Sequence, residues 1–124
     1  MRIRTGTDII EISRVKESIE STKEKFCEKV YTKKEREYCE SKKMQKYQHY
    51  AARFSAKEAV FKAVSDELEN KFQINWKDIE ILNDEKGRPY VNILNNKIQN
   101  IEDIDISLSH CKEYAIANVV VIFK

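Results

Sequence analysis

The sequence predicts an α+β domain in which an antiparallel sheet packs against a long central helix and shorter helices. Three observations predict this class. Alternating segments at the two ends of the chain are typical of strands. A helical pattern occupies residues 45–69, and only two glycines and one proline interrupt the 124 residues. So few helix and strand breakers favour a chain that is rich in regular structure.

Length and composition indicate one domain, which we place at residues 1–124. No apolar run approaches the roughly 20 residues that cross a bilayer, so we expect no membrane segment. The N-terminus is typical of a strand rather than of a signal peptide. Three cysteines without metal-ligand spacing indicate reduced thiols, and we therefore expect a cytoplasmic protein.

The first half of the chain is expected to hold a strand followed by short helices. Residues 2–12 alternate as in a strand, with Gly6 and Asp8 on the same face. A helix is expected from an N-cap at Ser13 to Ile19. Capping-box spacing predicts two further helices, starting near residues 22 and 33, at Ser21 with Glu24 and at Thr32 with Glu35.

The second half is expected to hold the long helix, two hairpins and a short helix. The sequence predicts strands at 78–83 and 89–94, a short helix at 95–101, and a C-terminal hairpin formed by 104–109 and 114–123. The last strand is apolar on both faces, so both faces need cover. In a small domain another subunit could cover one of them, which predicts an oligomer.

The long helix carries two apolar stripes, one of alanines and one of larger residues, and its charges lie on the two borders between them. Glu58 and Lys62 share one border at the spacing of an ordinary surface ion pair, worth only about 0.3–0.5 kcal/mol. Arg53 and Lys57 are like-charged on the other border. Either a phosphate ligand or a carboxylate of the protein would relieve their repulsion.

Asp8 is unusual because aspartate is depleted inside strands. One interpretation is that Asp8 ends the strand or caps a turn. The other is that it binds Mg²⁺, which takes one or two protein carboxylates and leaves positions for water and phosphate. Glu58 could supply the second carboxylate if the strand and the helix pack side by side.

The segment 14–46 contains eleven lysines and arginines interleaved with acidic residues. Such interleaving is typical of a solvated helical surface. The alternative is a docking surface for an acidic protein. Because the glutamates would repel phosphates, we do not expect a nucleic-acid partner.

Four stretches occur in a characteristic order along nearly the whole chain. They are Gly6–Ile12 followed by Arg14, then Arg53–Ala63, Gly87-Arg88-Pro89, and Ile106–His110 with Glu113–Ala115. Together they resemble the holo-acyl-carrier-protein synthase family, the small class of 4′-phosphopantetheinyl transferases. The strand motif G-x-D and the helix motif F-x-x-K-E-A-x-x-K are highly specific in combination.

The resemblance implies a 4′-phosphopantetheinyl transferase fold and a Mg²⁺-dependent homotrimer with sites between neighbouring subunits. The implied reaction moves the 4′-phosphopantetheine arm of coenzyme A to a serine of apo acyl carrier protein. It releases adenosine 3′,5′-bisphosphate and supports fatty acid biosynthesis.

The resemblance also assigns residues to roles. Asp8 and Glu58 would hold Mg²⁺, Glu58 would help to deprotonate the carrier's serine, and Lys62 would neutralise charge on the phosphate. Arg14 and Lys16 would dock the acidic carrier. The residues expected to bind coenzyme A are Arg53, Lys62, Ser65, Gly87, Arg88, Pro89, His110 and Cys111.

Two positions depart from the family's pattern. The family usually has a K-A-x-G-x-G turn after the helix, whereas this chain has no glycine in residues 62–68 and carries Asp66 and Glu67 instead. Cys111 stands where threonine is usual. We expect an active enzyme with altered affinity for coenzyme A. The rival hypotheses are an inactive relative that docks an acidic partner, and a purely structural α+β oligomer.

Overall fold

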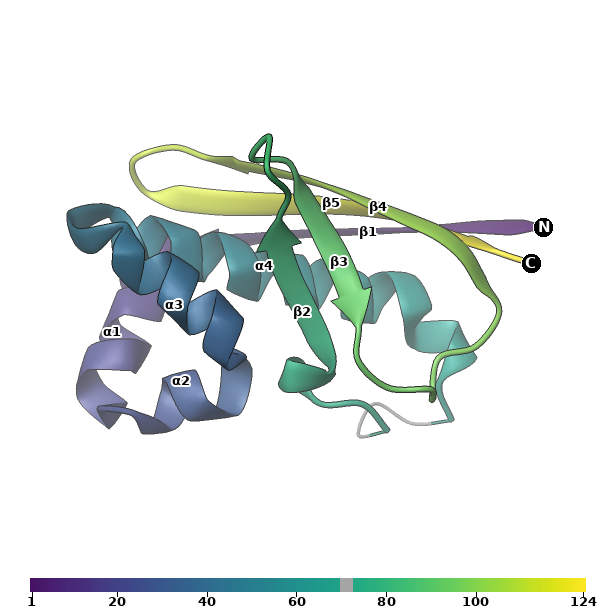
Figure 1. Cartoon of the computed structure of the whole chain (residues 1–124), viewed down its shortest axis with the longest axis horizontal. Helices are drawn as coiled ribbons and strands as arrows, with labels where there is room; N and C mark the ends of the chain where they lie inside the picture. The colour runs from purple at the N-terminus through teal and green to yellow at the C-terminus, as the bar shows by residue number, and fades with distance from the viewer. Residues whose placement is uncertain (70–72) are drawn as a thin grey trace.

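A computed structural model describes residues 1–69 and 73–124 and confirms the α+β class. A long helix contacts both a three-stranded and a two-stranded sheet, and three short helices gather at one end of it (Figure 1). The elements are β1 (Arg2–Glu11), α1 (Ile12–Thr22), α2 (Lys25–Val30), α3 (Lys33–Ser41), η1 (Lys43–Gln45), α4 (Lys46–Val64), η2 (Ser65–Glu67), η3 (Trp76–Asp78), β2 (Ile79–Asn83), β3 (Pro89–Ile93), β4 (Ile101–His110) and β5 (Tyr114–Phe123).

The larger sheet is antiparallel, with the strand order β1-β5-β4, and β2 and β3 form a separate hairpin. The predicted strands and both predicted hairpins are therefore confirmed. In the larger sheet Asp8 of β1 lies opposite Ala117 of β5. The side chains of β5 alternate between buried and more exposed positions, as expected for a strand that packs on one face.

The alanine stripe of α4 packs against this sheet. Ala56, Ala59 and Ala63 are buried in the same core cluster as Ala117 and Val119 of β5. Because alanines are small, β1 can approach the helix backbone closely. At Gly6 there is no room for a β carbon beside the carbonyl group of Ala59.

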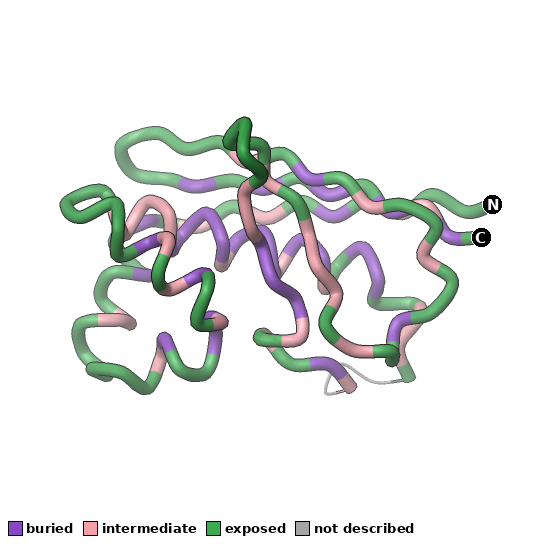
Figure 2. Tube along the Cα trace, in the orientation of Figure 1, coloured by how far each residue is buried: buried purple, intermediate pink, exposed green. Residues whose placement is uncertain are grey.

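The opposite face of the sheet has no cover within the described residues. Four apolar side chains on it are between 37% and 61% exposed: Ile3, Ile9, Ile116 and Val120. The tube in Figure 2 shows the alternation of buried and exposed positions along β5. The two faces of β5 are thus both apolar, as the sequence indicates, but one chain covers only one of them.

The first helix boundaries differ from the prediction. α1 begins at Ile12, so Ser13 lies inside it, and it continues to Thr22 rather than ending at Ile19. No side chain caps its start, and the Ile12 amide instead donates to the carbonyl of Glu113, at 2.8 Å.

The Ser21–Glu24 capping box does not form, because Ser21 is still inside α1 and α2 starts only at Lys25. The Thr32–Glu35 box is confirmed. The Glu35 amide donates to the Thr32 hydroxyl, and the Thr32 amide donates to the Glu35 carboxylate.

The long helix is shorter than predicted. α4 ends at Val64, and the chain then makes one 3₁₀ turn, Ser65–Glu67. In this turn Asp66 pairs with Arg4 and Glu67 pairs with Arg2. These ion pairs hold the turn against β1.

The helix predicted at 95–101 does not form, because β4 begins at Ile101 and residues 95–100 are irregular. The Asn95 side chain accepts a hydrogen bond from the Lys97 amide, at 2.9 Å. Such a local bond competes with helix formation.

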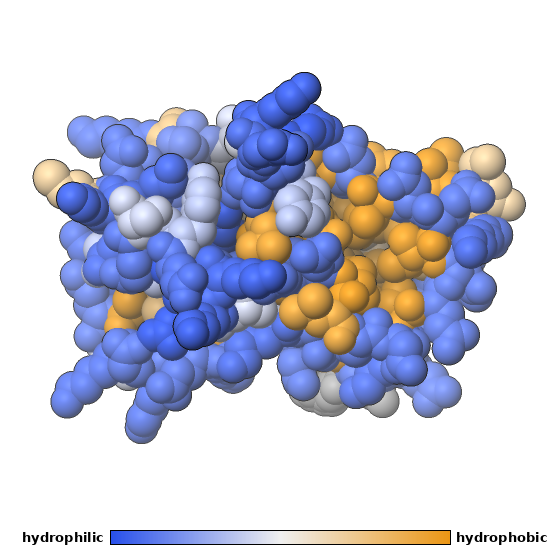
Figure 3. All heavy atoms as spheres, in the orientation of Figure 1, coloured by the Kyte–Doolittle hydropathy of each residue, from blue (hydrophilic) through white to orange (hydrophobic). Residues whose placement is uncertain are grey.

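The surface divides into two parts on the face drawn in Figure 3. Hydrophilic side chains cover the short helices α1 to α3, and apolar side chains gather over β3 and β4. Within residues 1–69 and 73–124, no helix is both long enough and apolar enough to span a membrane.

Candidate active site

Asp8 of β1 and Glu58 of α4 lie on one cleft of about 310 Å³. The close packing of β1 on α4 brings these two carboxylates together, as the sequence predicts if strand and helix lie side by side. Arg14 of α1, Phe54 of α4 and Tyr114 of β5 also line the cleft. Three packed elements and the start of α1 therefore form its walls.

Asp8 is held by two side chains of α4. The Ser55 hydroxyl donates to the Asp8 carbonyl oxygen at 2.8 Å and lies 3.1 Å from Oδ2. The Lys62 ammonium donates to Oδ1 at 3.1 Å and to the carbonyl of Thr7 at 2.9 Å. Asp8 lies inside β1, which continues to Glu11, so the interpretation that it ends the strand or caps a turn is wrong.

The electrostatic environment of Glu58 favours its neutral form. Burial raises the pKa of Glu58, the negative charge of Asp8 raises it further, and Lys62 opposes these effects. Lys62 forms an ion pair with Asp8. Within the part of the chain that the structure describes, no ion pair joins Lys62 to Glu58. The interpretation of Glu58 and Lys62 as an ordinary surface pair is therefore wrong.

The donor set of this cleft suits a hard divalent cation. Two carboxylates of like charge share a half-buried site with one lysine, and a bound cation would remove the repulsion that raises the pKa of Glu58. Carboxylate oxygens are the protein ligands that Mg²⁺ prefers. Asp8 and Glu58 are the residues that could hold it.

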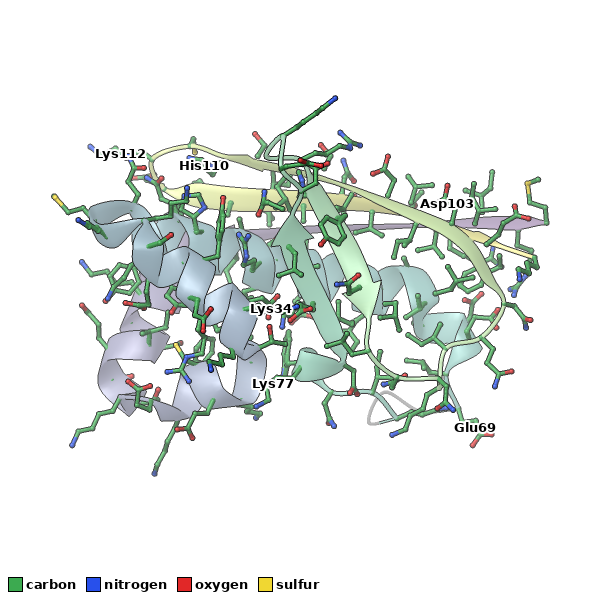
Figure 4. All side chains as sticks on the ribbon, in the orientation of Figure 1. Lys34, Glu69, Lys77, Asp103, His110 and Lys112 are labelled. Atoms are coloured by element: carbon green, nitrogen blue, oxygen red, sulfur yellow. The ribbon has the colours of Figure 1, made fainter. Side chains whose placement is uncertain are left out.

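A second cleft, of about 380 Å³, lies where α4, the β2–β3 hairpin and the end of β4 meet. Figure 4 shows His110 and Lys112 at the β4–β5 turn, above the beginning of α4. The structure brings five of the predicted coenzyme A residues together here: Arg53, Gly87, Arg88, Pro89 and His110.

Arg53 is a buried cation in this second cleft, with only 2% of its surface exposed. Its Nη2 donates to the Asn83 side chain, and its guanidinium carbon lies 4.2 Å from the ring centroid of Tyr38. Its Nε has no hydrogen-bond partner, and no carboxylate among the described residues pairs with it. An unsatisfied buried cation is costly, so this site favours an anionic ligand.

Lys57, the like-charged neighbour of Arg53, is relieved in a different way. It is fully buried and pairs with the equally buried Glu35, at 2.7 Å. Its ammonium also donates to the carbonyls of Val30, at 2.5 Å, and Trp76, at 3.1 Å. The sequence leaves open a phosphate or a protein carboxylate as the relieving anion. A carboxylate pairs with Lys57, and no carboxylate of residues 1–69 or 73–124 pairs with Arg53.

Four of the predicted residues make contacts of their own. Arg88 donates from Nη2 to both carboxylate oxygens of Asp105, at 2.9 Å each. The Ser65 hydroxyl donates to the Lys62 carbonyl at 3.0 Å, and Cys111 is exposed in the turn after β4. Ser65 and Cys111 line neither cleft. Lys16 lines a neighbouring hollow, with its amine 5.5 Å from the ring centroid of Tyr47.

The two clefts have no lining residue in common. One chain therefore presents the carboxylates and the buried arginine in separate places. Three residues that sequence reasoning missed are Ser55, which holds Asp8, Asn83, which holds Arg53, and Tyr114. Ser55 could have been found from its place inside the helix motif, between Arg53 and Lys57.

Comparison with known proteins shows the family to which the chain belongs. Residues 4–119 match the 4′-phosphopantetheinyl transferase superfamily. The chain is 48% identical to a holo-[acyl-carrier-protein] synthase of Ruminiclostridium cellulolyticum, with 98% of this chain and 92% of the relative covered.

Two solved structures have the same fold. One is the Chronobacterium ammoniagenes ACPS–CoA complex, with a TM-score of 0.85, 27% identity, and 100% of this chain and 99% of that chain covered. The other is a Bacillus anthracis holo-(acyl-carrier-protein) synthase in complex with CoA (3′,5′-ADP), with a TM-score of 0.80, 32% identity, and coverage of 98% and 96%. The chain therefore belongs to the holo-[acyl-carrier-protein] synthases, enzymes of the 4′-phosphopantetheinyl transferase superfamily.

Proposed function

We propose that this enzyme transfers the 4′-phosphopantetheine arm of coenzyme A to a serine of apo acyl carrier protein, with Mg²⁺, in support of fatty acid biosynthesis. The observation that carries the proposal is the carboxylate pair Asp8 and Glu58 beside Lys62, together with an unpaired buried arginine elsewhere on the chain. Two relatives of known structure are complexes with CoA, which supports coenzyme A as the donor.

Mg²⁺ fits the first cleft because its protein ligands would be the two carboxylates Asp8 and Glu58. When bound, it would supply positive charge to the pyrophosphate oxygens of the donor. Without Mg²⁺, binding and orientation of the substrates would depend on the side chains of the protein alone.

Glu58 is suited to act as the base. In the reaction the serine oxygen bonds to the phosphorus that carries the pantetheine arm, and the bond from that phosphorus to the leaving phosphate breaks. Adenosine 3′,5′-bisphosphate leaves. Glu58 would accept the serine proton, and burial, the largest cause of its raised pKa, makes this carboxylate a better base near neutral pH. Lys62 would neutralise charge on the phosphate oxygens, where phosphoryl transfer needs it most.

The second cleft would hold the nucleotide end of coenzyme A. Arg53 and His110 would bind its phosphates, because Arg53 is a buried cation with an unused donor. The turn Gly87-Arg88-Pro89 would line the adenine. Ser65 and Cys111 would contact the donor from outside the two clefts.

A homotrimer with sites between subunits would bring the two clefts together. Two observations support it: the uncovered apolar sheet face, and two clefts that share no residue. Each subunit would be one domain spanning residues 1–124. A site at the junction would then combine Asp8 and Glu58 of one subunit with the buried arginine of a second copy.

The carrier would dock beside the first cleft. Arg14 lines that cleft, and Lys16, two residues later on α1, lines the neighbouring hollow, so both could contact an acidic helix. We place the reaction in the cytoplasm, where the three free thiols would stay reduced.

The direct test incubates the purified protein with Mg²⁺, coenzyme A and apo carrier and measures the carrier's mass. We expect a gain of one phosphopantetheine group. Asp8→Ala and Glu58→Ala should abolish the gain while leaving the thermal melt nearly unchanged. Turnover that persists in either variant would remove that residue from the metal site, and carrier binding without any mass gain would favour an inactive docking protein.

A further inference from the structure

His49 lies on α4 one turn before Arg53 and lines the same cleft, yet none of the roles above uses it. Residues four apart share one side of a helix, with an axial rise of about 6 Å between them. A group bound at Arg53 would therefore lie within reach of the His49 ring. The imidazole makes no hydrogen bond with any described residue, so its nitrogens remain available to a ligand.

The ring of Tyr38 brings three nitrogen-bearing side chains to one place. His49 meets it edge-on, with ring centroids 5.5 Å apart and planes at 78°. The guanidinium carbon of Arg53 lies 4.2 Å from the same centroid, and the Lys42 amine lies 4.8 Å from it. His110 of β4 lines the cleft from the other side.

Burial and the neighbouring side chains set the charge of His49. The titratable neighbours that bear on it are Lys42 beyond α3, Arg53 on α4 and His110 on β4, while Arg88 at the rim is already paired with Asp105. Burial, and then repulsion from Arg53, Lys42 and His110, lower the pKa of His49 to about 4. In the free enzyme His49 is therefore neutral at physiological pH.

We propose that His49 is a binding residue for the same phosphate monoester as Arg53, and that it takes up a proton when this dianion enters the cleft. The inference rests on the proposed function, because it takes the ligand to be a phosphate of coenzyme A. A dianion opposes the repulsion from Arg53 and Lys42 that, together with burial, keeps the ring neutral. The imidazolium then adds a charge-assisted N–H donor to those of Arg53.

The linkage has a definite sign. The pKa of His49 is higher in the complex than in the free enzyme, so protonation favours binding. The contribution of His49 to the affinity is greatest at low pH and is lost as pH rises through the His49 pKa of the complex, with a slope of at most about tenfold per pH unit for one proton. This dependence separates His49 from Arg53, which stays charged throughout.

The test is a calorimetric titration with adenosine 3′,5′-bisphosphate at pH 6.5, in two buffers that differ in ionisation enthalpy. The buffer dependence gives the number of protons taken up for each ligand bound. His49→Phe keeps a ring against Tyr38 but has no nitrogen, and His49→Gln keeps polar atoms that do not titrate. We expect both variants to take up measurably less than the wild-type enzyme does, by at most one proton per ligand, and to bind the bisphosphate several-fold more weakly. Protonation of the ligand's own phosphates contributes to the measured uptake in the wild-type enzyme and in the variants alike. It therefore cancels when the uptake of a variant is subtracted from that of the wild-type enzyme.

His110→Gln is the matched control, because it removes the other histidine of the cleft. Support for the proposal is a loss of proton uptake in both His49 variants that His110→Gln does not reproduce.

Equal uptake in the wild-type enzyme and the His49 variants would overturn the role of His49 and leave the proposed function intact. The role of His49 is overturned in the same way if only His110→Gln loses the uptake. If the wild-type enzyme does not bind the bisphosphate at all, both the inference and the nucleotide role of this cleft are overturned. The melting temperature of each variant shows that the fold is retained.

Discussion

Gly6 of β1 lies directly against the backbone of Ala59 of α4: a β carbon at residue 6 would stand 1.9 Å from the Ala59 carbonyl oxygen and 2.8 Å from its carbonyl carbon. These are backbone atoms inside a helix, so they cannot turn aside as a flexible side chain could. The contact therefore fixes how closely β1 approaches α4. Asp8 lies two residues further along the same face of β1, and its distance from Glu58 depends on this approach.

Gly6→Ala is expected to push β1 away from α4. Overpacking of this kind costs about 1–3 kcal/mol of unfolding free energy, and the transfer rate should fall further because Asp8 moves with the strand. Denaturant unfolding and the carrier mass assay measure the two effects. An alanine at residue 6 with unchanged stability and rate would show that the contact does not position Asp8.

Lys57→Met is expected to destabilise the fold strongly. It leaves the Glu35 carboxylate buried without its cation, and breaking a buried pair costs about 3–5 kcal/mol. Lys33→Met is the matched control, because Lys33 and Glu37 form an exposed pair on α3 at 4.0 Å and such pairs contribute about 0.5 kcal/mol or less. Equal losses in the two variants, measured by denaturant unfolding, would contradict a structural role for the buried pair.

The stability of the metal-free enzyme should depend on the charge of Glu58. Its pKa in the folded chain lies above the unfolded value, so its protonated form favours folding, and this contribution is lost as pH rises through the folded pKa. In chelator at pH 7.5, Glu58→Gln should melt at a higher temperature than the wild-type enzyme.

Two further measurements check this interpretation. The difference in melting temperature between the wild-type enzyme and Glu58→Gln should disappear near pH 4, where a carboxyl group with a raised pKa is already protonated. Added Mg²⁺ should stabilise only the wild-type enzyme, since a ligand stabilises the folded state that binds it. The wild-type enzyme should then melt at the higher temperature of the two. A variant that is less stable than wild type in chelator would mean that the repulsion from Asp8 is already compensated.

The three cysteines should differ sharply in reactivity. Cys111 is exposed, whereas Cys27 and Cys39 are buried. Burial raises the pKa of the Cys27 thiol and raises the pKa of Cys39 to about 12. Because the thiolate is the reactive form, a thiol reagent at pH 8 should modify one cysteine quickly and the other two only after unfolding. Rapid native labelling of Cys39 would show that α3 opens readily.

Mixed oligomers test whether one site draws on two subunits. Asp8→Ala and Arg53→Ala chains should each be inactive alone. If they are unfolded and refolded together, about a quarter of the junctions between subunits in a random mixture would combine an intact Asp8 with an intact Arg53. The mixture should regain a corresponding share of the wild-type rate. No recovery, with mixed assembly shown by native mass spectrometry, would place the whole site within one chain.

Local patterns predict the parts of this fold that depend on neighbouring residues. Thr32 and Glu35 form the expected capping box because both bonds lie within one turn. Asp8 and Glu58 meet because a glycine and an alanine stripe allow β1 to lie against α4. The Ser21–Glu24 box has the same spacing but fails, since α1 passes through Ser21 without interruption.

Features that depend on distant contacts could not be predicted in this way. Lys57 and Arg53 have the same charge and lie on the same border of α4, but only Lys57 finds a carboxylate, from a helix 22 residues away in sequence. The separation of the two clefts likewise depends on how the β2–β3 hairpin and the end of β4 cross α4. No spacing within the helix motif contains this information.

The order of strands in the larger sheet has a consequence for how the chain is made. β5 is the central strand, it comes last of the described elements, and it pairs along its whole length with β1, from Arg2 opposite Phe123 to Glu11 opposite Tyr114. During synthesis neither β1 nor β4 can join this sheet until β5 has emerged, whereas α1 to α3 need only local contacts. Such non-local pairing is slow to form. The strand β1, which carries Asp8, is thus paired late, and until β5 has emerged only its contacts with α4 hold Asp8 close to Glu58.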